Sequence, residues 1–163
     1  MVCYSLDCGG HVENLGGAIT MMNMVEPGKS VKKYDCIWVI KPLTNYFHLK
    51  THIYLKVVTF SNMADAAEII VRKGVTSDGP IIESARFNSF QGKNSPSKVE
   101  HIVPLNVGFY VTLHGAFSAS SRVAIVILLS ALWTSLRPLF HLIETVFLDL
   151  IFCAKTIDAF PAI

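Results

Sequence analysis

Hydrophobic and polar positions alternate in two stretches of this chain. From Phe47 to Val57 the odd positions read Phe, Leu, Thr, Ile, Leu and Val, and the even positions read His, Lys, His, Tyr and Lys. A second stretch, Phe109 to Phe117, alternates in the same way. Because successive side chains of a strand point to opposite faces, this pattern predicts strands with one buried face and one solvated face.

Shorter apolar runs predict further strands, because turn-rich spacers such as EPGKS and GVTSDG separate them. No convincing helical pattern precedes residue 123, so we expect an all-β fold, an antiparallel β-sandwich. The segment 18–26 fits either a short helix or a strand, with its methionines filling irregular core space. The other strand candidates are 37–41, 68–72, 80–87 and 99–103.

The character of the sequence changes after residue 122. Residues 1–122 carry 12 basic and 9 acidic side chains, whereas residues 123–163 carry 2 and 3. Residues 123–136 begin as a strand pattern and run on as apolar sequence. From Pro138 onward, apolar residues recur at i, i+3 and i+4, which predicts an amphipathic helix. We therefore divide the chain into a sandwich over 8–122 and an apolar tail over 123–163, an extra strand followed by a helix.

Three interpretations of the tail stay open. It packs on the sandwich or lies at a membrane surface as an amphipathic helix. It anchors the chain as a membrane span, although residues 123–136 fall short of the ~20 that a helix needs to cross a bilayer. Extending the span to residue 153 would bury charged groups, among them Arg137, Glu144 and Asp149. Alternatively, the tail is a non-native continuation of a fragment, a short isoform or a flawed gene model.

Charge and cysteine content exclude some functions. The net charge is +2 and no basic run exceeds Lys32-Lys33, so we expect no nucleic-acid partner. The four cysteines at 3, 8, 36 and 153 allow three disulfide connectivities. Without a CxxC pair or a Cys-His cluster, we expect no structural zinc. The opening MVCYSLDCGG lacks the pattern of a secretory leader.

No constellation of residues predicts catalysis or a cofactor. His48 and His52 have a spacing found in metal sites, but on a strand they lie about 13 Å apart, too far to share an ion. Neither a Gly-x-Ser-x-Gly turn nor a glycine-rich phosphate loop is present. We therefore expect a protein without catalytic activity.

The polar side of the first alternating stretch is a candidate surface for a protein partner. Lysines and tyrosines there suit an acidic or protein ligand, and tyrosine is favoured in contact patches. The alternative is an ordinary solvated strand face. The residues of this candidate face are Tyr46, His48, Lys50, His52, Tyr54 and Lys56.

Taken in order, several pieces of the chain resemble a CUB domain, an extracellular β-sandwich module. The match covers roughly residues 8–117. The pieces are Cys8-Gly9-Gly10, then Cys36-Ile37-Trp38-Val39-Ile40 closing at Pro42, then 53–60, then Glu68 to Gly74, and finally Gly108-Phe109-Tyr110. The resemblance implies a CUB-like jelly roll, a disulfide between Cys8 and Cys36, and Trp38 packed in the core beside it.

The chain departs from the family at two features. The family's second cysteine pair is absent, with Ala64 at the first of its places. Two of the acids through which many CUB domains bind calcium fall on Ala67 and near His101. Since calcium requires several oxygen ligands, we do not expect calcium binding.

The resemblance implies a non-catalytic, extracellular or cell-surface protein–protein interaction module from a modular protein. Two alternatives are an accessory CUB domain of a secreted metalloprotease and a membrane-associated accessory protein of a receptor or channel. Cys3 and Cys153 stay unassigned; they pair with each other or with partners outside this chain.

Overall fold

The computed structural model describes residues 3–4, 8–13, 16–44, 52–88, 92–93 and 99–130. The chain divides into two compact units, Met1–Ser130 and Ala131–Ile163. All of the described residues belong to the first unit. The predicted helix, which begins near Pro138, lies outside the described residues. Cys153 lies outside them as well. Cys3 is described only through its backbone, in a two-residue strand.

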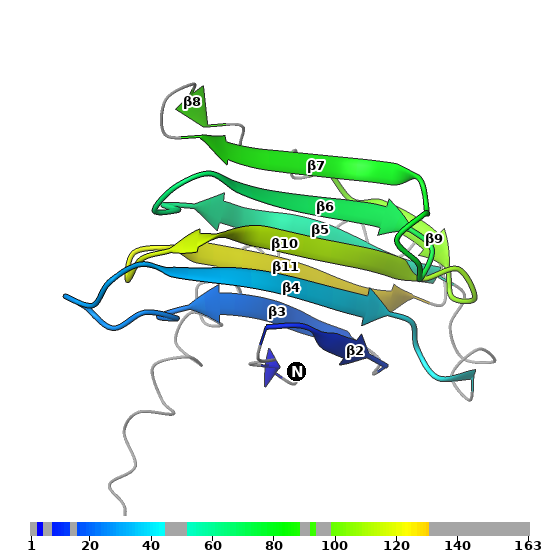
Figure 1. The fold of residues 1–163 in the computed structure, drawn as a ribbon. Helices are drawn as coiled ribbons and strands as arrows, with labels where there is room; N and C mark the ends of the chain where they lie inside the picture. Colours follow the sequence, from blue (N-terminus) through cyan, green and yellow to red (C-terminus); the bar gives the residue numbers. More distant parts are fainter. Residues whose placement is uncertain are drawn as a thin grey trace, which may run out of the picture. The chain divides into compact units, whose positions relative to one another are not determined.

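The described residues form two β-sheets and contain no α-helix, as the alternating patterns predicted. The five-stranded sheet has the order β1 (Cys3–Tyr4), β3 (Gly16–Met22), β11 (Arg122–Ser130), β5 (His52–Ser61) and β9 (His101–Pro104). The six-stranded sheet has the order β2 (Gly10–Val12), β4 (Lys32–Ile40), β10 (Phe109–Phe117), β6 (Ala67–Lys73), β7 (Ile81–Asn88) and β8 (Gly92–Lys93). In Figure 1 the six-stranded sheet lies in front of the other.

The predicted strands occur at their expected places. The stretch Phe109–Phe117 is β10, with the predicted limits. The segment that fitted a helix or a strand contributes β3, which ends at Met22. Of the stretch Phe47–Val57, the described part begins with β5 at His52.

Strand β11 covers the extra strand that the sequence predicted from residue 123 onward. It pairs with β3 on one side and with β5 on the other, so it is the middle strand of the five-stranded sheet. The sandwich therefore includes residues 123–130, and its compact unit ends at Ser130 rather than at residue 122. The segment is apolar because β11 is a central strand, with a neighbouring strand on each side.

The pairing is antiparallel except near the amino terminus. There, β1 pairs with β3 and β2 pairs with β4 in parallel. Both parallel pairs are short. They lie at one edge of each sheet, so the amino-terminal segment contributes an edge strand to both layers of the sandwich.

Inward-facing residues of both sheets form the apolar core. Trp38 and Phe109 from the six-stranded sheet and Ile19 and Leu55 from the other are fully buried. One position has no room for a side chain: a Cβ atom on Gly115 would lie 2.4 Å from the Cβ atom of Ala67, its cross-strand partner. Close packing of β10 against β6 therefore requires glycine here.

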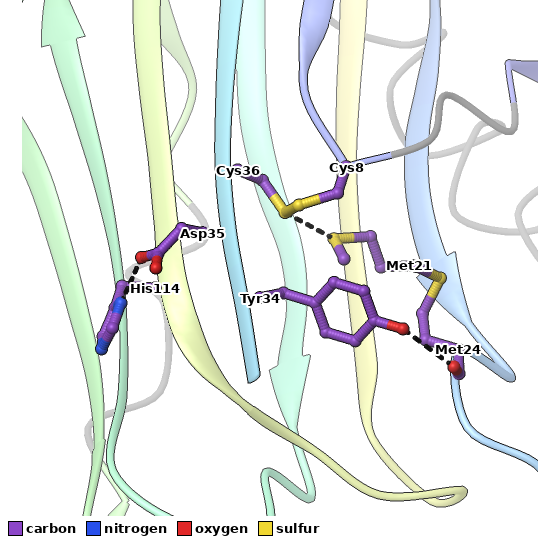
Figure 2. Close-up of a disulfide and its surroundings, with 7 residues drawn as sticks. All are labelled: Cys8, Met21, Met24, Tyr34, Asp35, Cys36 and His114. Atoms are coloured by element: carbon purple, nitrogen blue, oxygen red, sulfur yellow. Dashed lines mark hydrogen bonds and ion pairs between the residues drawn. A yellow bond between two sulfur atoms is a disulfide. The ribbon is translucent and has the colours of Figure 1, made fainter. Parts of the chain in front are cut away.

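A disulfide attaches the amino-terminal segment to the core. Cys8 and Cys36 are bonded, with Cα atoms 4.8 Å apart and a sequence separation of 28. This is the pair that the CUB resemblance implied. Figure 2 shows Met21 beside the bridge, with its sulfur 3.9 Å from that of Cys36. Trp38, two residues along β4, is buried on the same side of the strand, as expected.

Removal of the disulfide will destabilise the fold. Replacing both cysteines (Cys8→Ala with Cys36→Ala) should lower the free energy of unfolding by about 3–4 kcal/mol, because the bridge restricts the unfolded chain. Urea unfolding of both proteins measures this. Reductant should destabilise the wild type to a similar degree and leave the double variant unchanged. Equal stability of the oxidised wild type and the double variant would contradict the prediction.

Candidate functional site

The predicted partner-binding face lies only partly within the described residues. Tyr46, His48 and Lys50 lie outside them, whereas His52, Tyr54 and Lys56 are on β5. Tyr54 was expected on a solvated face. Only 4% of its surface is exposed, so it is buried instead. Its cross-strand neighbours on this side of the sheet are Leu128 and Ile102.

Lys56 is also less exposed than a solvated lysine. Its side chain is 17% exposed, and its Nζ atom lies 4.0 Å from a carboxylate oxygen of Glu100. The alternation placed Tyr54 and Lys56 on one side of β5 correctly, but it could not show that this side of the sheet is largely apolar. A partner for the remaining residues of that face stays a prediction.

A buried contact between a histidine and a glutamate links the two sheets. Glu83 lies on β7 of the six-stranded sheet, and His101 lies on β9 at the edge of the five-stranded sheet. The Nε2 atom of His101 is 2.6 Å from Oε2 of Glu83, and the two side chains are 14% and 3% exposed. A carboxylate at such depth requires hydrogen-bonding partners, because its removal from water is costly. The pair therefore holds these neighbouring edges of the sandwich together.

A row of charged side chains crosses the outer face of the six-stranded sheet. His114 on β10 lies directly opposite Asp35 on β4 and, on its other side, directly opposite Glu68 on β6. Glu68 in turn lies opposite Arg86 on β7. We call these four residues the charged row. Because all four point away from the core, the row is open to solvent.

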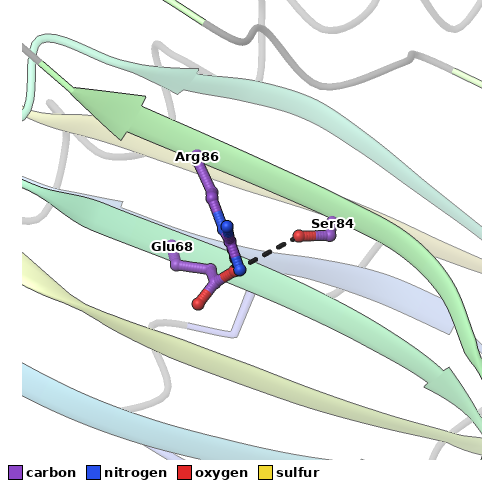
Figure 3. A network of polar contacts seen from close by, with 3 residues as sticks. All are labelled: Glu68, Ser84 and Arg86. Atoms are coloured by element: carbon purple, nitrogen blue, oxygen red, sulfur yellow. Dashed lines mark hydrogen bonds and ion pairs between the residues drawn. The ribbon is translucent and has the colours of Figure 1, made fainter. Parts of the chain in front are cut away.

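The charged row contains two contacting pairs. The Nδ1 atom of His114 contacts Oδ1 of Asp35, on the side of β4 opposite the disulfide (Figure 2). The Nε atom of Arg86 lies 2.5 Å from Oε1 of Glu68, which also accepts a hydrogen bond from Ser84 (Figure 3). The side chains of Asp35 and Arg86, at the ends of the row, are 79% and 69% exposed.

Two less polar rows run parallel to the charged row on the same face. They are formed by Ile37, Thr112, Ile70 and Ser84, and by Val39, Tyr110, Arg72 and Ile81. Ile37 is 49% exposed and Ile81 is 52% exposed. We call the three rows together the outer face. Apolar and aromatic groups next to charged ones are typical of a surface that contacts another protein.

The alternating patterns of the sequence did not predict this surface. The alternation in Phe109–Phe117 placed Tyr110, Thr112 and His114 on one side of a strand. Register then brings residues of β4, β6 and β7 into line with them, and a single strand pattern carries no information about register.

Other polar features of the sandwich are structural. In the turn between β6 and β7, a hydrogen bond from the side chain of Thr76 lowers the pKa of Asp78, with smaller contributions from its backbone N–H and from Arg72. Arg72 donates to the carbonyl oxygen of Gly79 in the same turn.

Within the described part of the chain, no three His, Cys, Asp or Glu residues are placed to hold a metal ion. The same part contains no helix with the length and apolar character needed to cross a bilayer.

Comparisons with known proteins show only remote likenesses. No protein-family model and no curated protein matches the chain. Among solved structures, a carbohydrate-binding module, CsCBM6-3 from Clostridium stercorarium in complex with cellobiose, is 14% identical, with 71% of this chain and 82% of that chain covered and a TM-score of 0.23.

A second likeness is to a cycloisomaltooligosaccharide glucanotransferase from Paenibacillus sp., solved with cycloisomaltoheptaose. It is 15% identical, with 73% of this chain and 17% of that chain covered, again at a TM-score of 0.23. This chain thus spans only a small part of the glucanotransferase. At these TM-scores neither likeness supports a ligand for this protein.

Loss of the buried Glu83–His101 contact should lower stability more than loss of the exposed Asp35–His114 contact. His101→Ala should lower the free energy of unfolding by about 1–3 kcal/mol, because it deprives the buried carboxylate of Glu83 of a partner. His114→Ala removes the matched, exposed partner of Asp35 and should cost less than about 0.5 kcal/mol. Chemical unfolding of the two variants and the wild type measures both values. Equal losses would contradict a special role for the buried pair.

Proposed function

We propose that this protein is a non-catalytic, extracellular protein-interaction module that contacts its partner through the outer face of its six-stranded sheet. The observation that carries the proposal is the make-up of this face. Ile37 on β4 and Ile81 on β7 are about half exposed, Tyr110 lies on β10 between these strands, and the charged row borders the row of Ile37. Interfaces typically combine exposed apolar side chains, often with tyrosine, with polar ones.

The disulfide supports an extracellular location. A bond between Cys8 and Cys36 persists in oxidising compartments and is rare in the reducing cytosol. The bridge joins the buried Cys36 to the amino-terminal segment, so its loss would release an edge of the sandwich.

The CUB resemblance belongs to the same proposal. Two all-β layers, the Cys8–Cys36 bridge and the buried Trp38 support it. The expected lack of calcium binding is supported by the two positions where acids are missing. Ala67 is buried opposite Gly115, and His101 is engaged with Glu83. Partner recognition would then depend on side-chain contacts rather than on a bound ion.

Binding to intact cells tests the role of the outer face. The oxidised full chain, fluorescently labelled and applied to cells of its source organism, should bind saturably, and prior trypsin treatment of the cells should abolish this binding. Ile37→Lys should weaken binding at least tenfold, because a charge replaces an apolar contact on the outer face.

Val31→Lys is the matched control. Val31 is 52% exposed in the segment before β4, away from the three rows of the outer face. Its replacement should leave binding unchanged. Binding that resists Ile37→Lys, or that falls equally with both variants, would contradict the proposed surface.

Thiol trapping tests the location. Rapid alkylation of intact cells and medium, followed by peptide mapping, should recover Cys8 and Cys36 as a disulfide in the native protein. Recovery of both residues as alkylated free thiols would contradict an oxidising compartment.

A further inference from the structure

We propose that a second copy of this chain binds to the outer face, so that the protein forms a two-fold symmetric, face-to-face dimer. This inference rests on the proposed function, since it names the partner of that same surface. Its basis is the order of charges along the charged row, which is complementary to itself when reversed.

The charged row reads Asp35, His114, Glu68, Arg86 from β4 to β7. In a dimer with two-fold symmetry the same surface of both copies meets, so each residue faces its mirror position in the row. A two-fold axis that runs parallel to the strands, over the line between β10 and β6, reverses the order of the charged row in the second copy. Asp35 of one copy then faces Arg86 of the other, and His114 faces Glu68. The Asp35–Arg86 contact joins opposite charges and occurs twice, whereas His114 carries a charge only when its ring is protonated.

The two less polar rows are also compatible with reversal. Val39 then faces Ile81, which joins two apolar side chains across the interface. In the same row Tyr110 faces Arg72, a pairing in which a guanidinium can stack on an aromatic ring. In the other row Thr112 faces Ile70 and Ile37 faces Ser84, so each isoleucine meets a small hydroxyl side chain. No like charges meet in any of the three rows.

Asp35 and Arg86, at the ends of the charged row, each have polar atoms available for a contact with the second copy. Arg86 contacts Glu68 through Nε, which leaves the two terminal Nη groups of the guanidinium to bind a second carboxylate. Asp35 contacts His114 through Oδ1, which leaves its Oδ2 atom as an acceptor. Packed sheets cross at about 30°, which displaces the row ends by about 4 Å, a distance that a long arginine side chain can span.

The size of the surface predicts a weak dimer. Four strands about 4.8 Å apart and three rows about 7 Å apart cover about 400 Å² on each copy. This is roughly half of the ~800 Å² that each partner contributes to a standard interface. We therefore expect a dissociation constant on the order of 10–1,000 μM.

Charge reversal with mixing tests the proposal. Sedimentation velocity of the oxidised full chain from 10 to 300 μM should show a monomer–dimer equilibrium. Asp35→Arg places like charges at positions 35 and 86 of facing copies, and so does Arg86→Asp. Each single variant should therefore dimerise at least tenfold more weakly.

An equimolar mixture of the two variants should recover dimers near the wild-type level. In the mixed dimer both pairs of facing positions again carry opposite charges. A change that merely destabilised one chain would not be rescued by mixing, because each chain keeps its own substitution. Asp65→Arg and Lys29→Asp make the same charge changes at exposed positions off the outer face, and they should leave dimerisation unchanged.

Conservative variants cover the case in which a reversed charge prevents folding. Asp35→Asn and Arg86→Gln should each weaken the dimer by a smaller factor. The proposal is overturned if the wild type stays monomeric at 300 μM, if association is unchanged in every outer-face variant, or if mixing fails to restore dimers of two folded variants. A monomeric wild type whose binding to cells still depends on Ile37 would overturn the dimer alone and leave the proposed function standing.

Discussion

The structure depends on one apolar layer between two sheets. Trp38, Phe109 and the other inward residues of the six-stranded sheet pack against Ile19, Leu55 and their neighbours from the five-stranded sheet. Because side chains alternate along a strand, the same packing directs Asp35, Ile37 and His114 to the opposite side. The outer face is thus a consequence of the core, and any slip in register would mix the two.

Two covalent or polar links reinforce the layer at its margins. The Cys8–Cys36 bridge attaches the amino-terminal segment, which adds a short parallel strand to each sheet. Near the opposite edges, Glu83 and His101 connect β7 to β9. The disulfide restricts the unfolded chain, whereas the Glu83–His101 contact supplies a polar partner to a buried carboxylate. Both keep the strands that carry the charged row in a constant arrangement.

The proposed recognition would use a face whose strands are already joined by polar contacts. Contacts between neighbouring strands link Asp35 to His114 and Glu68 to Arg86. A side chain held in place before a partner binds loses less conformational entropy on binding. The proposed dimer uses this order directly, because its specificity comes from the sequence of charges across four strands rather than from any one residue.

The sequence by itself determined the all-β class, the limits of β10, and which residues of a strand share a side. Through the CUB resemblance it also indicated the Cys8–Cys36 pair with Trp38 beside it. Only the tertiary structure decided the central place of β11, the burial of Tyr54, the Glu83–His101 pair and the charged row. The physical reason is that alternation along one strand encodes its two sides, while register and neighbouring strands arise from contacts between residues far apart in sequence.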